Sequence, residues 1–266
     1  MQGDHSNFRH QINYLTGLGY RVIVPNFPTY TVTLTTKFNN SAQERSQFIK
    51  DFLATLNIFQ IALVVAHSAG MYAAVQLLDD ERFNVDNLVF INPAAGISIL
   101  NARYRIILYR FVFRQLNSLY KLDSFREYMQ PLVERIIDTA SRNNPNVPSD
   151  MDIALLQACV IAYTDADDIN KSIDNLKAKI NENKIKLLMI FSEKDRFISV
   201  KKMYELAKFL SDNETFEYYD EIGNVEKNVE FKLPYITISR KGDHIFFVKD
   251  PSIVEKAMNK FLTHKL

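Results

Sequence analysis

The chain has 266 residues, enough for one large domain with a sizeable core, and no break in composition favours two domains. Its 32 lysines and arginines nearly balance its 31 aspartates and glutamates, which argues against nucleic acid or an anionic membrane as a partner. The single cysteine, Cys159, excludes an internal disulfide, and no signal-peptide pattern is present, so we expect a reducing, cytoplasmic location. The apolar runs are far shorter than the roughly 20 residues that a membrane span requires.

The first third of the chain alternates between strand and helix patterns. Three apolar, β-branched runs are typical of buried strands, and they occupy residues 19–27, 60–66 and 85–91. Ser41 and Glu44 have the spacing of a capping box, and helical periodicity follows them to Leu56. A run of helix formers, residues 71–78, comes directly after the second strand. This alternation predicts an α/β fold with a doubly wound, mostly parallel sheet.

The middle of the chain interrupts this alternation. Residues 97–183 show only helical patterns, with a loop at 143–148, and we interpret them as a helical lid inserted into the sheet domain. Strand and helix patterns then resume, with strands at 185–191 and 235–239 and helices at 200–210 and 252–262. Residues 211–232 are charged and irregular. We therefore predict three parts, namely the first half of a core sheet (1–96), the lid (97–183) and the second half of the sheet (184–266).

Ser68 lies where a predicted strand ends and a helix begins, in the sequence Ala66-His67-Ser68-Ala69-Gly70. This context is typical of a nucleophile elbow, in which small residues two before and two after the serine let strand and helix approach closely. In such a turn the backbone N–H of Ala69 donates to an oxyanion. The alternative is a serine that caps the following helix. We interpret His67 as a packing or lining residue rather than a base.

Two residues that follow later strands supply the groups that an activated serine needs. Asp195 lies beyond the strand run that ends at Phe191, and His244 lies beyond the run at 235–239. Active sites of open α/β sheets gather at the carboxyl ends of the strands. A carboxylate there can hold a histidine in one tautomer while the histidine takes the proton of the serine. The alternatives are an ordinary turn aspartate and an exposed loop histidine.

The order of the three residues strengthens the prediction. Ser68, Asp195 and His244 each follow a predicted strand, and serine, acid and histidine is the order expected for this fold. Glu193 and Asp243 are weaker candidates for the acid. This chemistry needs no cofactor and no metal ion, so we expect neither.

Several segments resemble the α/β-hydrolase fold superfamily, and together they span nearly the whole chain. They are Gly-Asp-His-Ser-Asn-Phe at 3–8, Gly-Tyr-Arg-Val-Ile-Val-Pro-Asn-Phe-Pro at 19–28, the acid segment at 191–195, and Gly-Asp-His at 242–244. The resemblance implies an α/β-hydrolase sheet with an inserted helical lid, of the serine hydrolase type. Within the superfamily the chain is similar to an uncharacterised hydrolase-like branch, which implies no particular reaction.

The same resemblance implies a difference at the N-terminus. Members of the superfamily open with an antiparallel hairpin and a third strand that ends in His-Gly, whereas this chain starts at Met1-Gln2-Gly3. We therefore expect the first three strands to be missing, and to be encoded upstream. The second oxyanion donor of the family follows the third strand, which leaves the backbone of Gln2 or Gly3 to supply it.

The sequence thus predicts a serine-dependent hydrolase, of the carboxylic ester hydrolase type, for an ester or related acyl bond. Four aromatic residues of the lid suggest a small, apolar acyl substrate, although such stripes also form cores; they are Tyr104, Tyr109, Phe111 and Phe113. Epoxide hydrolase or dehalogenase chemistry would need aspartate in place of Ser68. The alternative is a noncatalytic hydrolase-like binding protein or an inactive truncated product, favoured by Ala66 in place of glycine and by the missing oxyanion segment.

Overall fold

The computed structural model describes residues 5–28, 38–94, 103–120, 122–143, 160, 162–211, 216–227 and 229–263. The chain divides into two compact units. The first, here called the sheet unit, comprises Phe8–Ile23, Ile49–Ile99 and Ala166–Leu266. The second, here called the helical unit, comprises Met1–Asn7, Val24–Phe48 and Leu100–Asp165. Ser68, Asp195 and His244 all belong to the sheet unit.

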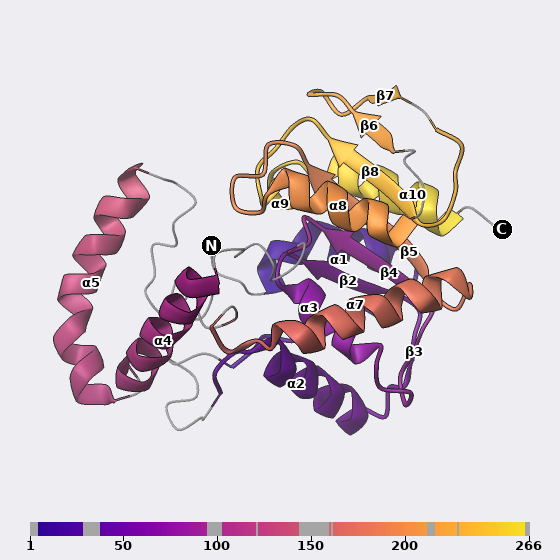
Figure 1. Ribbon diagram of the computed structural model, residues 1–266. Helices are drawn as coiled ribbons and strands as arrows, with labels where there is room; N and C mark the ends of the chain where they lie inside the picture. The colour runs from indigo at the N-terminus through magenta and orange to yellow at the C-terminus, as the bar shows by residue number, and fades with distance from the viewer. Residues whose placement is uncertain are drawn as a thin grey trace. The chain divides into compact units, whose positions relative to one another are not determined.

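The sheet unit is built on a six-stranded sheet with the strand order β2-β4-β5-β8-β6-β7 (Figure 1). In that order the strands are Val64–His67, Asn87–Ile91, Lys186–Ser192, Tyr235–Ser239, Glu217–Tyr219 and Val225–Lys227. All neighbours pair in parallel except β6 and β7, which are antiparallel. The short strands β1 (Gln60–Ile61) and β3 (Asn84–Val85) form a separate parallel pair. Since β2, β4, β5 and β8 run in one direction, their carboxyl ends meet at one edge.

The central strands are buried on both faces, which explains their continuous apolar sequences. Residues 88–91 of β4 and 187–191 of β5 are all fully buried. Alternate side chains of these strands join a core cluster with residues of α1 (Arg9–Gly17) and α10 (Ser252–Thr263). Figure 1 shows α3 (Gly70–Leu77), α7 (Ala166–Asn181) and α8 (Val200–Ser211) on the opposite side of the sheet from α10. The predicted mostly parallel, doubly covered sheet is confirmed.

The remaining helices are η1 (His5–Phe8), α2 (Ala42–Thr55), α4 (Arg103–Tyr120), α5 (Asp123–Asn143) and α9 (Phe246–Lys249). The predicted capping box of α2 is confirmed, because the Glu44 N–H donates to Ser41 Oγ (3.1 Å) and the Ser41 N–H donates to the Glu44 carboxylate (3.0 Å). In the helical unit, Arg110 and Arg114 of α4 donate to backbone carbonyls of residues 162 and 164. Within the described residues, no helix combines the length and apolar character of a membrane span.

Two expectations from the sequence are wrong. The strand expected at 19–27 does not form, because an extended run becomes a strand only where another strand pairs with it, and none does so within the described residues. Tyr20 and Val22 instead pack against the core cluster. The segment 211–232, expected to be irregular, contains β6 and β7. Cys159, the side chains of Tyr104 and Tyr109, and nearly all of the expected loop at 143–148 lie outside the described residues.

Candidate active site

Ser68 occupies the turn between β2 and α3. Its backbone φ of +53° lies in the left-handed region, which residues other than glycine rarely adopt. Its N–H donates to the carbonyl of Ile91 and its carbonyl accepts the N–H of Ala94, both at 3.1 Å, so the turn is fastened to the end of β4. Ala69 is the N-cap residue of α3, and none of the described side chains caps this helix. The alternative in which Ser68 caps the helix is therefore wrong.

The residues on either side of Ser68 leave room for this turn. Ala66 is buried, and a Cβ atom placed on Gly70 would lie 4.0 Å from the Cβ of Ala66, which is an ordinary contact. Ala66, which replaces the usual first glycine of a nucleophile elbow, therefore does not clash with the start of α3. Ala69 is at the N-terminus of α3, and none of the described residues accepts a hydrogen bond from its N–H. N–H groups at a helix N-terminus favour an anion. Gln2 and Gly3 lie outside the described residues.

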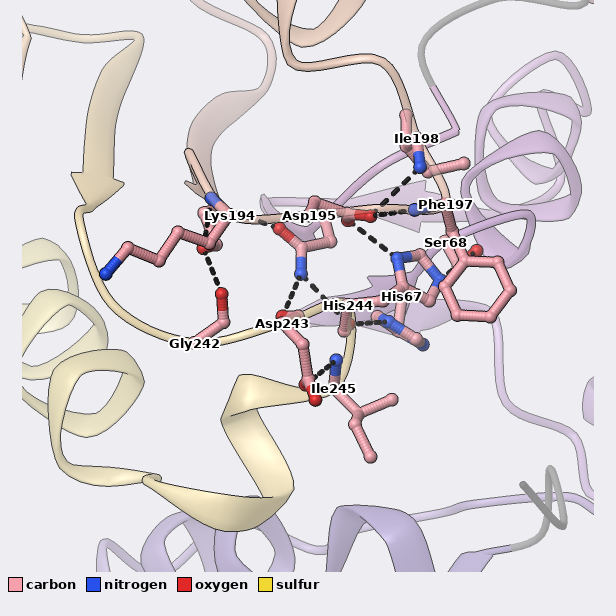
Figure 2. A network of polar contacts seen from close by, with 12 residues as sticks. His67, Ser68, Lys194, Asp195, Phe197, Ile198, Gly242, Asp243, His244 and Ile245 are labelled. Atoms are coloured by element: carbon pink, nitrogen blue, oxygen red, sulfur yellow. Dashed lines mark hydrogen bonds and ion pairs between the residues drawn. The ribbon is translucent and has the colours of Figure 1, made fainter. Parts of the chain in front are cut away.

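Ser68, His244 and Asp195 form a continuous line of polar contacts at the carboxyl edge of the sheet (Figure 2). Ser68 Oγ lies 2.8 Å from His244 Nε2, and His244 Nδ1 lies 2.7 Å from Asp195 Oδ2. Because a carboxylate only accepts, the proton of the neutral ring is on Nδ1, and Nε2 accepts from the serine hydroxyl. In this arrangement the ring can receive the serine proton.

The carboxylate of Asp195 is buried and has two sets of partners. Its Oδ2 faces His244, whereas its Oδ1 accepts the N–H groups of Phe197 (2.7 Å) and Ile198 (2.9 Å). The latter two bonds form an aspartate turn, which was the alternative considered for this residue. Asp195 therefore stabilises the turn and faces His244 at the same time.

The two weaker acid candidates point elsewhere. Glu193 accepts hydrogen bonds from the Tyr204 hydroxyl (2.7 Å) and from Arg240 (2.8 Å). Asp243 accepts the N–H of Ile245 (3.0 Å) and pairs with Lys249. Neither carboxylate has a hydrogen bond to the His244 ring among the described residues. They anchor the loops on which Asp195 and His244 lie.

The ring of His67 packs against the ring of His244. Its ring centroid lies 4.7 Å from that of His244 and 4.6 Å from that of Phe247, and its Nε2 lies 2.9 Å from the backbone carbonyl oxygen of His244. Burial, together with the neighbouring His244, lowers the pKa of His67 to about 3. His67 is therefore neutral at pH 7, and its Nε2–H donates to the carbonyl, since a carbonyl oxygen only accepts.

Sequence reasoning missed two residues that contact this arrangement. Asn92 is fully buried, and its amide donates to the carbonyl oxygens of His244 (2.9 Å) and Asp243 (3.2 Å). Phe197 is 47% exposed, and its ring centroid lies 5.2 Å from that of His244. Both follow a strand at the same sheet edge as the three predicted residues, and this position in the sequence could have identified them.

Among the described residues no cluster of histidine, cysteine, aspartate and glutamate is suited to hold a metal ion.

A parallel sheet with a serine at a strand-to-helix turn on its carboxyl edge is the architecture of α/β-hydrolases. Within that fold, the chain belongs to the family described as "Alpha/beta hydrolase of unknown function (DUF1057)", whose model matches residues 1–266. No match is found among curated proteins. The α/β-hydrolase resemblance seen in the sequence is thus confirmed.

Solved structures of similar fold cover nearly the whole chain. A thermophilic esterase from Thermogutta terrifontis has a TM-score of 0.60 at 14% identity, over 97% of this chain and 85% of its own. A carboxylesterase from Nitrososphaera gargenis has a TM-score of 0.56 at 15% identity, over 98% and 86%. A bromoperoxidase from Bacillus anthracis has a TM-score of 0.55 at 13% identity, over 98% and 88%. At these identities the similarity shows the fold alone.

Proposed function

We propose that this chain is a serine hydrolase that cleaves an ester or related acyl bond, with Ser68 as nucleophile, His244 as base and Asp195 as the orienting acid. The observation that carries the proposal is the line of two short contacts, 2.8 Å from Ser68 Oγ to His244 Nε2 and 2.7 Å from His244 Nδ1 to Asp195 Oδ2. Membership of an α/β-hydrolase family supports it.

In the proposed reaction Ser68 Oγ attacks the acyl carbon while its proton moves to His244 Nε2. Asp195 accepts from Nδ1–H throughout and stabilises the imidazolium that forms. The leaving group takes the proton from Nε2 and departs, which leaves an acyl group on Ser68. A water molecule then attacks the acyl carbon, His244 takes its proton, and the acid product is released as Ser68 regains its hydrogen.

The negative oxygen of the tetrahedral intermediate needs donors at the serine turn. The Ala69 N–H at the start of α3 is one proposed donor, and the helix N-terminus adds a favourable electrostatic field. A backbone N–H of Gln2 or Gly3 is the proposed second donor. Loss of one such donor lowers the rate of comparable enzymes by about 10²- to 10³-fold, so the second donor matters for turnover.

A small substrate with an apolar acyl group is the proposed class. Its support is the exposed ring of Phe197, which gives the surface beside His244 an apolar wall. Because two of the solved structures with a similar fold are an esterase and a carboxylesterase, short carboxylic esters are the first compounds to test.

The test is labelling with a fluorophosphonate, which reacts only with an activated serine, together with hydrolysis of a short p-nitrophenyl ester. We expect the protein to be labelled and to release p-nitrophenol. Ser68→Ala should abolish labelling and lower kcat by about 10⁴-fold or more, because the nucleophile is gone.

Ser118→Ala is the matched control, because Ser118 is exposed and, among the described residues, its hydroxyl donates only to the carbonyl of Arg114 in the same helix, α4. This variant should be labelled as strongly as the unmodified protein. If the folded protein is neither labelled nor active on a panel of esters, the alternative of a noncatalytic ligand-binding protein replaces the present proposal.

A further inference from the structure

The backbone carbonyl of His244 accepts hydrogen bonds from two side chains. His67 Nε2–H donates to it at 2.9 Å and Asn92 Nδ2–H donates at 2.9 Å. The two donors come from different strands, since His67 is the last residue of β2 and Asn92 directly follows β4. A carbonyl held from two sides leaves the peptide plane of His244 little freedom to rotate, and this plane sets the direction of the side chain.

Asn92 also holds the segment that leads to Asp195. Its Oδ1 accepts the N–H of Ser192 (2.9 Å), the last residue of β5, and its own N–H donates to the carbonyl of Ile190 (2.8 Å). Its amide nitrogen lies on the other side, between the carbonyl oxygens of Asp243 and His244. One fully buried side chain therefore joins the strand end that leads to the acid and the loop that carries the base.

This side chain is suited to its place in a way that few others would be. The φ of Asn92 is +40°, in the left-handed region that asparagine and aspartate tolerate better than other residues with a side chain. It must also donate on one side and accept on the other, which an amide does and a carboxylate or an alkyl group does not.

We propose that Asn92 and His67 are positioning residues, which act through the His244 carbonyl to keep the imidazole in line between Ser68 and Asp195. The proposal rests on the proposed function, because it assigns a role in the same reaction. Neither side chain needs to touch the substrate. Errors of about 1 Å in the placement of a reacting group can lower a rate by about 10²-fold, so a small shift of the His244 loop is enough to matter.

The sharpest test is Asn92→Asp, which keeps the shape, the tolerance for positive φ and the acceptor for the Ser192 N–H. It replaces the amide donor with a carboxylate oxygen that faces two carbonyl oxygens, so the loop should move away. We expect kcat for a p-nitrophenyl ester to fall about 10²-fold while KM changes by less than about threefold. Asn87→Asp is the matched control, because Asn87 lies at the other end of β4 and its amide donates to the carbonyl of Ala62 (2.8 Å).

A second readout does not require turnover. The proton between His244 Nδ1 and Asp195 should give a far-downfield proton NMR resonance, identified by its loss in His244→Gln. Asn92→Asp should shift or broaden this resonance, and Asn87→Asp should leave it in place. If no ester is hydrolysed but the resonance responds in this way, the proposed reaction fails and the positioning role stands.

His67 provides an independent pair of variants in case Asn92→Asp does not fold. His67→Gln can keep an N–H donor near the His244 carbonyl, whereas His67→Phe keeps a ring but has no donor. We expect Gln to retain most of the kcat and the resonance, and Phe to lose both. A resonance and a kcat that are unchanged in both Asn92→Asp and His67→Phe would overturn the proposal.

Discussion

The two oxygens of the Asp195 carboxylate have different roles, one in closing a turn and one in contacting His244. Oδ1 closes the turn through the N–H groups of Phe197 and Ile198, and Oδ2 faces His244 Nδ1. Asparagine at position 195 would remove the charge and the oxygen that faces His244, but its amide oxygen could still accept from the N–H groups of the turn. This substitution therefore separates the two roles.

Asp195→Asn is therefore expected to keep the fold and lose the activity. The amide group of asparagine donates where the carboxylate accepted, so it favours the wrong tautomer of His244, with the proton on Nε2 and no acceptor for the Ser68 hydroxyl. We expect kcat to fall by about 10⁴-fold while the midpoint of thermal unfolding changes little. Steady-state hydrolysis and calorimetry measure the two effects.

The control is Glu193→Gln, since Glu193 was the other candidate acid on the same loop. Its carboxylate accepts from Tyr204 and Arg240, away from His244, so this variant should retain activity within about tenfold of the unmodified protein. A larger loss for Glu193→Gln than for Asp195→Asn would reverse the assignment of the acid.

At the scale of elements, the loop between β8 and α9 sets the position of His244 through its backbone. Gly242 in this loop has a φ of +94°, and a Cβ atom added to it would lie 2.3 Å from the Cβ of Phe246. Its carbonyl also accepts a hydrogen bond from the buried Ser192 hydroxyl at 2.7 Å. The loop can therefore keep this path only with glycine at this position.

Gly242→Ala should move the loop and reduce both stability and hydrolysis. A residue with a Cβ atom in such a conformation costs about 1 to 3 kcal/mol before the clash with Phe246 is counted. Gly17→Ala is the control, because an added Cβ there meets no atom of the described residues within 4 Å, and the change should be neutral or slightly stabilising. Chemical denaturation gives both free energies of unfolding, and equal values for the two variants would contradict the prediction.

Some strands of the sheet can be predicted from the sequence and others cannot. β4 and β5 were predicted because both faces are buried, and an unbroken apolar run is the direct result. β6 and β7 have three residues each, and β7 is exposed along its length, so neither gives a run or an alternation that stands out from a charged loop. The apolar run at 19–27 has the composition of a strand, but pairing depends on a partner that composition does not show.

At the scale of the whole molecule, the sequence predicted which residues meet but not what holds them. Ser68, Asp195 and His244 could be grouped because each follows a strand and the strands are parallel, so that their ends share one edge. The roles of His67 and Asn92 depend on the direction of one backbone carbonyl 177 and 152 residues away along the chain. No spacing or residue pattern in the sequence encodes that direction.

His67 also makes the stability of the whole sheet unit depend on pH. Burial lowers its pKa to about 3 in the folded protein, against an ordinary value of 6.5, so between these values the unfolded chain binds a proton that the folded chain does not. The free energy of unfolding must then fall as the pH falls from about 6.5 towards 3, and this contribution is constant above that window. This contribution changes the free energy of unfolding by at most about 1.4 kcal/mol per pH unit. The partial exposure of His67 to solvent makes the change smaller.

His67→Phe removes this proton site while keeping an aromatic ring against Phe247. We expect the variant to be less stable than the unmodified protein at pH 7, because the His244 carbonyl loses a donor, and the difference to shrink by about 2 kcal/mol or less between pH 6 and pH 4. Urea unfolding at several pH values measures both curves, and His5→Gln, at an exposed position, should follow the unmodified protein throughout. Parallel curves for His67→Phe and the unmodified protein would mean that His67 takes up its proton equally well in the folded and the unfolded chain.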